Sequence, residues 1–458
     1  MRKTLLTLLT IFLLPASHPA IADGVQGADV FFPDSGAPEA VRERLANRIL
    51  GKYRRSDPEF DYYYRQAVSL LTPNDNYLIV NAKVNSVNAF AHFGGFVAVM
   101  DGMWLFTRNE DELLGIVAHE IGHIKNDHFT RQKEKNKTVS ALSVPLLIAG
   151  ILHDDPELRQ ALIVGSSGIL SSEIYAYTRA LEHEADIFAL NLMNRAKRNS
   201  HSLGETFGRF TGGDYNEYVS THPAPLRRAS YLGDRLRGQS TPPSKNSLSY
   251  LLLRQKIIMT GRVRVNRKIK EELKEALTNE GDDKTIAQYG LLLLSTKSRE
   301  KPLGEEMRAA LSNAEHPFIL AAIAENLSRL GDKEKALTIL KKAHTNHPHS
   351  AALSLALIKT LAQTGRRKEA IALYETMPPD IKNRPDVLKQ TALAADKDKA
   401  LMNYLLAAGH FHNGDFELAV QQSAIAEKQK TNPEMLLKIL KLKKTAEKEL
   451  RLLKKRKN

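Results

Sequence analysis

The chemically most informative segment of this 458-residue chain is His119-Glu120-Ile121-Gly122-His123, which has the form HExxH. The two histidines are four residues apart. If the segment is helical, they share one face and both imidazoles can bind one metal ion. Glu120 then lies beside the water bound there and can take its proton before passing it to a leaving amine. The motif predicts metal-assisted hydrolysis, with His119 and His123 as ligands and Glu120 as the catalytic base.

A zinc ion in a hydrolytic site needs a third protein ligand and an open position for water. The chain has no cysteine, so the ligand must be His, Asp or Glu. The segment 182–186 is the best source, because Glu182 and Asp186 lie four residues apart and share one helix face. We expect Glu182 to bind a single Zn²⁺ and Asp186 to accept the free N–H of a ligand histidine. A merely solvated acidic face is the alternative interpretation, and His183 and Glu184 are expected to point to other faces.

Two helices and a small sheet have to position these residues. Asn109 and Glu112 precede an apolar run and resemble a capping box that opens the HExxH helix. A second helix is predicted over residues 173–196, with the small Ala185 allowing close packing. Residues 78–84 and 90–100 alternate small, β-branched and aromatic residues around Gly94-Gly95, which predicts two short strands and a turn. Residues 23–237 are therefore expected to form one mostly α domain with a small β-sheet.

The first 22 residues have the pattern of an export signal, with Arg2 and Lys3 before an apolar run and Ala20-Ile21-Ala22 as the cleavage site. An uncleaved anchor is the alternative, but the run has about 10 residues against the roughly 20 that a membrane span needs. We therefore expect a periplasmic protein. A second apolar run, residues 141–152, predicts a lid or a segment that grazes a membrane.

The chain beyond the Pro- and Ser-rich linker at residues 238–246 is helical in pattern. One set of residues recurs at a shift of 34, the length of a tetratricopeptide repeat: Leu327, Gly331 and Ala336 return as Leu361, Gly365 and Ala370. A third, shifted copy includes Gly414 and Ala419. The spacing predicts a tetratricopeptide superhelix over residues 247–433, with generic helical hairpins as the alternative.

Basic residues are concentrated at the end of the chain. The whole sequence has a net charge of +14, and residues 428–458 alone contain ten Lys and two Arg against three Glu. Residues 434–458 predict a basic amphipathic helix that either caps the repeats or makes peripheral contact with an anionic membrane. Binding of nucleic acid by this tail is a third interpretation, which we do not expect for an exported chain.

The two motifs together resemble those of the zinc endopeptidases that take their third ligand from an ExxxD motif, the family of the CAAX prenyl endopeptidase and the heat-shock membrane protease. Three further segments are similar to that family: Val87-Asn88-Ala89-Phe90 with Gly94-Gly95, Asp101-Gly102, and Thr178-Arg179. The resemblance covers residues 40–235 or so. It implies a zincin-type metalloprotease fold for this domain.

Thr221-His222-Pro223 resembles the His-Pro motif of the same family, and Arg228 follows it. The resemblance brings His222 and Arg228 into the expected site. His222 has two functional interpretations: it fills the fourth zinc position and keeps the enzyme latent, or it donates a hydrogen bond to the oxyanion during hydrolysis. A plain surface turn is the third interpretation.

An export signal, an HExxH domain and C-terminal repeats together resemble the periplasmic branch of this family. That resemblance implies an endopeptidase that acts on misfolded or misassembled exported proteins and docks through its repeats on the outer-membrane barrel-assembly machinery. We expect the substrate to lie extended beside a strand near Phe96–Met100. The alternative is a periplasmic chaperone or adaptor in which the repeats matter more than proteolysis.

Overall fold

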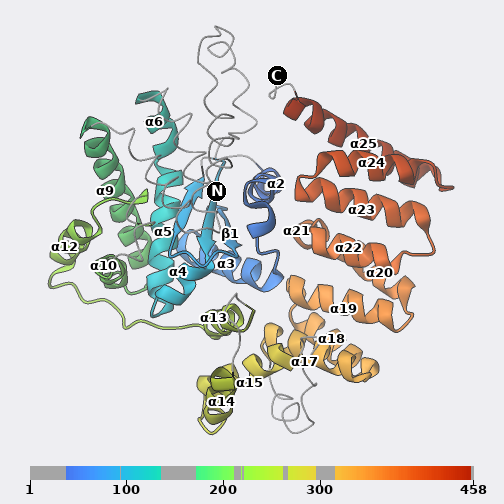
Figure 1. Ribbon diagram of the computed structural model, residues 1–458, viewed down its shortest axis with the longest axis horizontal. Helices are drawn as coiled ribbons and strands as arrows, with labels where there is room; N and C mark the ends of the chain where they lie inside the picture. Colours follow the sequence, from blue (N-terminus) through green and yellow to red (C-terminus); the bar gives the residue numbers. More distant parts are fainter. Residues whose placement is uncertain are drawn as a thin grey trace, which may run out of the picture.

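The computed structural model describes residues 38–92, 94–135, 172–210, 218, 221–260, 267–295 and 315–454. The predicted export signal and the apolar run at 141–152 lie outside these residues. Helices dominate the described chain, and a small sheet lies within its first half (Figure 1). This confirms the predicted fold class. Among the described helices, none combines the length and the apolar character that crossing a membrane requires.

The sheet has three strands, β1 (Leu78–Ala82), β2 (Ala89–His92) and β3 (Phe96–Met100). Their order is β1-β3-β2, with β1 parallel and β2 antiparallel to β3. Two strands were expected and three are present, because residues 90–100 form a hairpin in which Gly95, with a φ of 76°, lies in the turn between β2 and β3. The Phe96–Met100 strand is therefore central, with both edges paired, and cannot accept a substrate strand as expected.

The HExxH motif lies on α5 (Glu110–Lys125). Asn109 caps this helix, since its side chain accepts a hydrogen bond from the N–H of Glu112 at 3.0 Å. The Glu112 carboxylate accepts from the N–H of Arg108 at 2.6 Å, so the reciprocal bond of the expected capping box is displaced by one residue. Every residue of α5 from Glu110 to Ile124 is buried, which makes it the central helix of the domain.

The second predicted helix is α9 (Ser172–Arg195), which packs on α5. A Cβ added at Gly122 of α5 would lie only 3.0 Å from the Cα of Ala185, so the two helices meet at their smallest residues. The other helices of this half are α2 (Glu39–Leu50), the short 3₁₀ helix η3 (Gly51–Tyr53), α3 (Pro58–Leu71), α4 (Asp101–Phe106), α6 (His128–Lys135), α10 (His201–Gly208) and α12 (Pro225–Leu236).

The stretch predicted as a linker joins α12 to α13 (Leu248–Thr260), and α13 packs back on the first half. The Tyr250 ring stacks on Trp104 with centroids 5.6 Å apart. The ammonium group of Lys256 lies 2.7 Å from the Glu59 carboxylate. The hydrophobic core therefore continues across the linker, although the domain boundaries at residues 237 and 247 stay a prediction.

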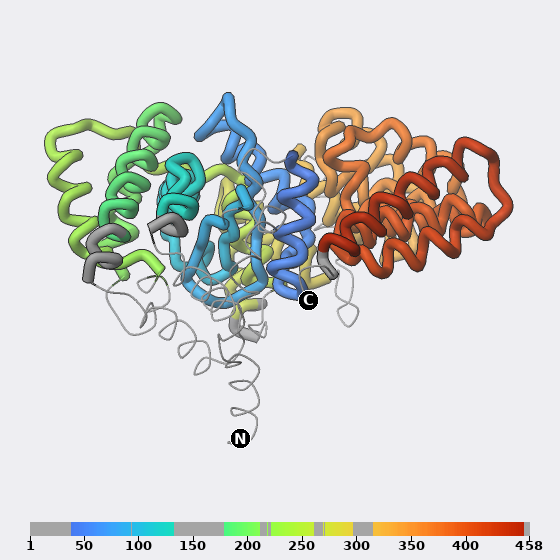
Figure 2. Tube along the Cα trace, turned by 90° about the horizontal axis from the view of Figure 1, so that it is seen from above, coloured from blue at the N-terminus to red at the C-terminus, as the bar shows by residue number. Residues whose placement is uncertain are grey.

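The second half is a curved array of helices (Figures 1 and 2). Gly331, Gly365 and Gly414 follow three of its helices in the left-handed region, with φ of 92°, 77° and 85°. Helical hairpins with these turns agree with the predicted repeats, while the bounds at residues 247 and 433 stay a prediction. The array consists of α14 (Arg267–Ala276), α15 (Asp282–Ser295), α17 (Pro317–Leu330), α18 (Lys333–Asn346), α19 (Ala351–Gln363), α20 (Arg367–Thr376), α21 (Pro379–Lys382), α22 (Pro385–Ala394), α23 (Lys399–Asn413), α24 (Phe416–Glu427) and α25 (Pro433–Lys454).

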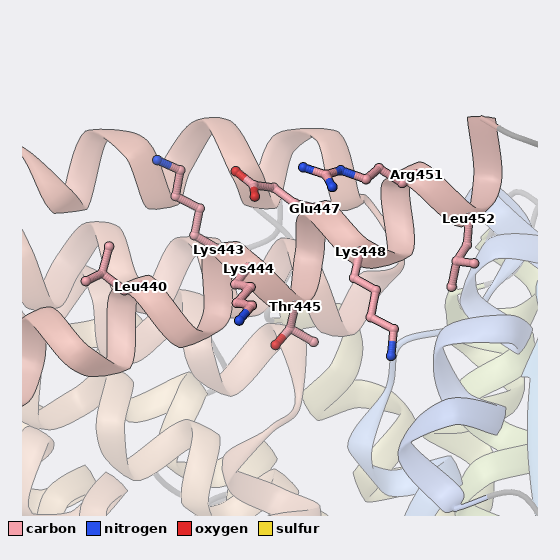
Figure 3. Close-up of a pocket in the computed structure, with 8 residues that line it drawn as sticks. All are labelled: Leu440, Lys443, Lys444, Thr445, Glu447, Lys448, Arg451 and Leu452. Carbon is pink, nitrogen blue, oxygen red and sulfur yellow. The ribbon is translucent and has the colours of Figure 1, made fainter.

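The last helix, α25, covers the end of the array. It packs on α24 and fully buries Ile439 and Ala446. The helix also borders a hollow of about 960 Å³ (Figure 3), which is lined by Leu440, Lys443, Lys444, Thr445, Glu447, Lys448, Arg451 and Leu452. Lys444 and Lys448 are exposed and form no ion pair with any described acidic side chain. The helix is thus a cap with a basic outer face.

Candidate metal centre and active site

Four buried side chains converge on one point between α5, α9 and the segment before α12. They are His119, His123, Glu182 and His222, and one nitrogen or oxygen atom from each lies within 4.8 Å of all the others. The Nε2 atoms of His119 and His123 are 3.1 Å apart, and the Glu182 carboxylate lies 3.4 Å from each of them. Each of the four residues was predicted from the sequence to lie in the site.

Asp186 lies behind His119, where its carboxylate is 2.9 Å from Nδ1 of the imidazole. This leaves Nε2 of His119 facing the centre. Burial and Arg228 lower the pKa of His119, but the bonds to Asp186 and Glu182 outweigh them and raise it to about 9. In the structure, Asp186 thus has the position expected for the partner of a ligand histidine.

Arg228 joins the two acidic residues. Its guanidinium lies 2.7 Å from the Glu182 carboxylate and 2.6 Å from that of Asp186, and it stacks 3.9 Å from the centre of the Phe207 ring. Burial alone would raise the pKa of both carboxyl groups. Arg228 keeps the pKa of Asp186 below its usual value, and His222 and Arg228 together keep that of Glu182 well below. Arg228 therefore positions both acids and keeps them ionised.

Glu120 faces the same point from the side of the sheet. Its Oε2 accepts a hydrogen bond of 2.8 Å from the N–H of Ala91 in β2. Its Oε1 lies 3.3 Å from Nε2 of His222, and neither atom has a hydrogen-bond partner among the described residues. Burial raises the pKa of Glu120, although His222 and His119 oppose the shift.

Several residues around the centre were missed or misjudged from the sequence. His128 lies beside His123, and Glu184, expected to point away, lies beside His128. Tyr231 donates a hydrogen bond to Asp186. The Tyr218 ring stacks on His222 with centroids 4.6 Å apart. The one available signal was spacing, since Tyr218 lies four residues before His222, about one helical turn.

The side chains present fit a metal ion. Three imidazoles and one carboxylate form the nitrogen and oxygen donor set that zinc takes in hydrolytic enzymes. All four are buried, and a buried polar atom without a partner is unfavourable, so a metal ion at their common point would satisfy the lone pairs that face it. The atoms without hydrogen bonds, on Glu120 and His222, face the same point. His119, His123 and Glu182 are the residues that would hold the ion.

Comparison with known families agrees with this geometry. Residues 63–236 match the model of peptidase family M48, and residues 327–389 match a tetratricopeptide-repeat model. The chain therefore contains a domain that matches peptidase family M48, followed by a stretch that matches tetratricopeptide repeats. The match to the peptidase family begins within α3 and ends at the last residue of α12, so it includes every residue of the site.

The chain is also similar to individual proteins, over stretches of different length. The chain is 28% identical over 283 residues to the beta-barrel assembly-enhancing protease of Yersinia pestis, covering 55% of this chain and 57% of that protein. The protein of the same name from Escherichia coli K12 is 24% identical over 349 residues, covering 72% of this chain and 69% of its own length. The metalloprotease YcaL of E. coli K12 is 28% identical over 170 residues, covering 36% of this chain and 65% of its own length. The chain thus spans little more than half of the Yersinia relative.

Proposed function

We propose that this chain is a zinc-dependent endopeptidase of the periplasm that cleaves misfolded or misassembled exported proteins and serves the assembly of outer-membrane β-barrels. The observation that carries the chemistry is the convergence of His119, His123 and Glu182, with Glu120 beside them. The link to barrel assembly is supported by the names of the Yersinia and Escherichia relatives. The expected export signal supports the compartment.

The residues of the chain divide the chemistry between them. When bound by His119, His123 and Glu182, zinc supplies a Lewis acid that polarises the scissile carbonyl and acidifies a water. Glu120 is the proton carrier. The Ala91 N–H holds its Oε2, which leaves Oε1 to take a proton from the attacking water and hand it to the leaving amine.

The substrate is proposed to lie along the edge of β2 that pairs with no described strand, instead of beside β3. β2 pairs with β3 on one side, and the N–H of Ala91 points to Glu120 on the other. A peptide that adds to this edge brings its backbone next to Glu120. Pairing through backbone groups selects extended, unfolded segments over any particular side chain, which suits a protease for misassembled proteins.

A Glu120→Gln variant tests the proposed activity. We expect it to lose casein cleavage by about 10²-fold or more, as the loss of a general base predicts. Chelation of the wild type should have the same effect, and zinc should restore cleavage. Glu110→Gln is the matched control, because Glu110 is equally buried on the same helix but bonds to Arg198 and Ser247. If cells with Glu120→Gln keep full function, the adaptor alternative replaces this proposal.

His222 is proposed to hold the enzyme latent. Its Nδ1 lies 3.1 Å from the Glu182 carboxylate and 3.4 Å from Nε2 of His119, inside the group of ligands. A histidine that takes the position needed by water blocks hydrolysis until it moves away. His222→Ala should then raise casein cleavage and self-cleavage. A fall in turnover of about 10²-fold would support the oxyanion role instead, and an unchanged rate would leave a plain turn.

The repeats are proposed to dock partners, the barrel-assembly machinery among them, while the outer face of α25 contacts an anionic membrane surface. Lys444 and Lys448 on that face are exposed, and Leu437 beside them is 67% exposed. Each cation near an anionic surface contributes about 1 kcal/mol, so replacing Lys444 and Lys448 with Gln should weaken binding to phosphatidylglycerol vesicles roughly 30-fold. The same change at Lys335 and Lys342 of α18 is the control. If both variants bind the vesicles equally well, the outer face of α25 is not the membrane-binding surface.

A further inference from the structure

The two ligand histidines differ in what lies behind them. Nδ1 of His119 meets a carboxylate directly, at 2.9 Å from Asp186. Nδ1 of His123 instead lies 2.9 Å from Nδ1 of a third imidazole, His128. Nε2 of His128 lies 3.2 Å from the Glu184 carboxylate, and Arg131 donates two hydrogen bonds to that carboxylate at 2.7 and 3.2 Å.

Proton positions along this chain of groups are tightly constrained. Nε2 of His123 faces the centre, so it can bind a metal only if its lone pair is free and the ring proton is on Nδ1. That proton must then be donated to Nδ1 of His128. His128 in turn must carry its own proton on Nε2, where it is donated to Glu184. The opposite direction would place a proton on Nε2 of His123 and block the ligand.

We propose that His128 and Glu184 are positioning residues that fix the ligand tautomer and ring orientation of His123, with Arg131 holding Glu184 in place. The inference rests on the proposed metalloprotease function. Glu184 sets the direction in which the hydrogen bonds are donated, because an ionised carboxylate only accepts hydrogen bonds. His128 is 2% exposed and is held between α5 and α9, so it transmits that direction to His123. Asp186 does the same for His119 without an intermediate.

The dissociation constant of the full-length chain for Zn²⁺, measured by competition with a chromophoric chelator, tests the proposal. His128→Phe fills the space but cannot accept a hydrogen bond, and we expect it to weaken Zn²⁺ binding about 10- to 100-fold, the range for lost outer partners of ligand histidines. His128→Gln offers an acceptor oxygen and should recover part of the affinity. Rescue by Gln separates positioning from a purely structural role.

Glu184 supplies a second variant that does not depend on the folding of His128→Phe. Its side chain is 42% exposed, so Glu184→Ala should lower the melting temperature of the metal-free protein less than His128→Phe does, while still weakening Zn²⁺ binding. Glu325→Ala is the matched control, because Glu325 is 47% exposed and pairs with Lys359 far from the site. Its Zn²⁺ affinity should equal that of the wild type.

The outcomes separate this inference from the proposed function. If the wild type binds Zn²⁺ and Glu182→Gln loses it, the metal centre stands. Wild-type affinity in both His128→Phe and Glu184→Ala would then overturn the positioning role alone. Failure of the wild type to bind Zn²⁺ would overturn the metalloprotease itself. Spectra of the Co²⁺-loaded variants provide an independent readout, since a reoriented His123 changes the visible absorption of the ion.

Discussion

The peptidase half and the repeat half of the molecule handle charge differently. Around His119, the acidic and basic side chains are buried and each bonds to several others, as Arg228 does with Glu182 and Asp186. In the repeats, pairs such as Lys359–Glu325 and Lys341–Glu369 are about half exposed and isolated from one another. When one member of an exposed pair in the repeats is removed, water solvates the charge that is left. When one member of a buried pair around His119 is removed, nothing replaces the lost partner.

The largest expected effect comes from removing a buried basic side chain, compared with removing an exposed one. Arg228→Met leaves two carboxylates buried without their cation, and we expect a loss of about 3–5 kcal/mol in the free energy of unfolding. Lys359→Met removes one member of an exposed pair and should change it by at most about 1 kcal/mol. Urea unfolding of both metal-free variants measures the difference. Equal losses would mean that burial does not set the strength of these contacts.

Buried histidines in the two halves are expected to make the free energy of unfolding depend on pH over different ranges. Burial lowers the pKa of His92 to about 3, and burial together with Arg44 lowers that of the half-buried His412 to about 4. Between those values and the ordinary 6.5, the unfolded chain binds protons that the folded chain does not. Each neutral histidine therefore contributes stability that is complete above pH 6.5 and is lost as the pH falls, by up to about 1.4 kcal/mol per unit.

Removing each histidine should reduce this acid sensitivity. His92→Gln should flatten the fall in unfolding free energy from pH 6.5 to about 3, and His412→Gln should do so only down to about 4. Unfolding curves of chelated protein at half-unit steps of pH give the slopes. An unchanged slope in His92→Gln would show that this imidazole is protonated in the folded state.

The sequence predicted those parts of the site that depend on spacing along one helix. His119 with His123, and Glu182 with Asp186, are each separated by one turn, so their shared face follows from helix geometry alone. The family resemblance added His222 and Arg228, which lie on a different segment. Contacts between elements were not predictable in this way. The position of Glu184 depends on where α6 places His128, and no spacing within α9 contains that information.

The strand order is a second feature that the sequence did not predict. Alternation of residue types located the residues of the sheet, but it does not determine which strand lies between the other two. Phe96–Met100 was expected beside the substrate, but it pairs with β1 on one side and with β2 on the other. The hairpin instead places β2 at the edge, with the N–H of Ala91 bonded to Glu120. The sequence therefore located the sheet correctly and its substrate edge incorrectly.

The two halves are also expected to respond differently when a methyl group is added to a glycine. Gly122 is helical and has no room, because an added Cβ would lie 3.0 Å from the Cα of Ala185. Gly365 has open space around it, but its φ of 77° disfavours a side chain. Gly122→Ala should therefore push α5 from α9 and weaken Zn²⁺ binding, at about 1–3 kcal/mol in stability.

Gly365→Ala should lower stability by only about 1–2 kcal/mol, the penalty of a left-handed residue, and leave Zn²⁺ affinity unchanged. Gly365→Asn is the informative companion, since Asn tolerates this conformation and should recover most of the loss. Thermal unfolding and chelator competition on the three variants separate the effects. If Gly365→Ala weakened Zn²⁺ binding as much as Gly122→Ala, the turn between two repeat helices would be coupled to the metal centre, and the two halves would not respond independently.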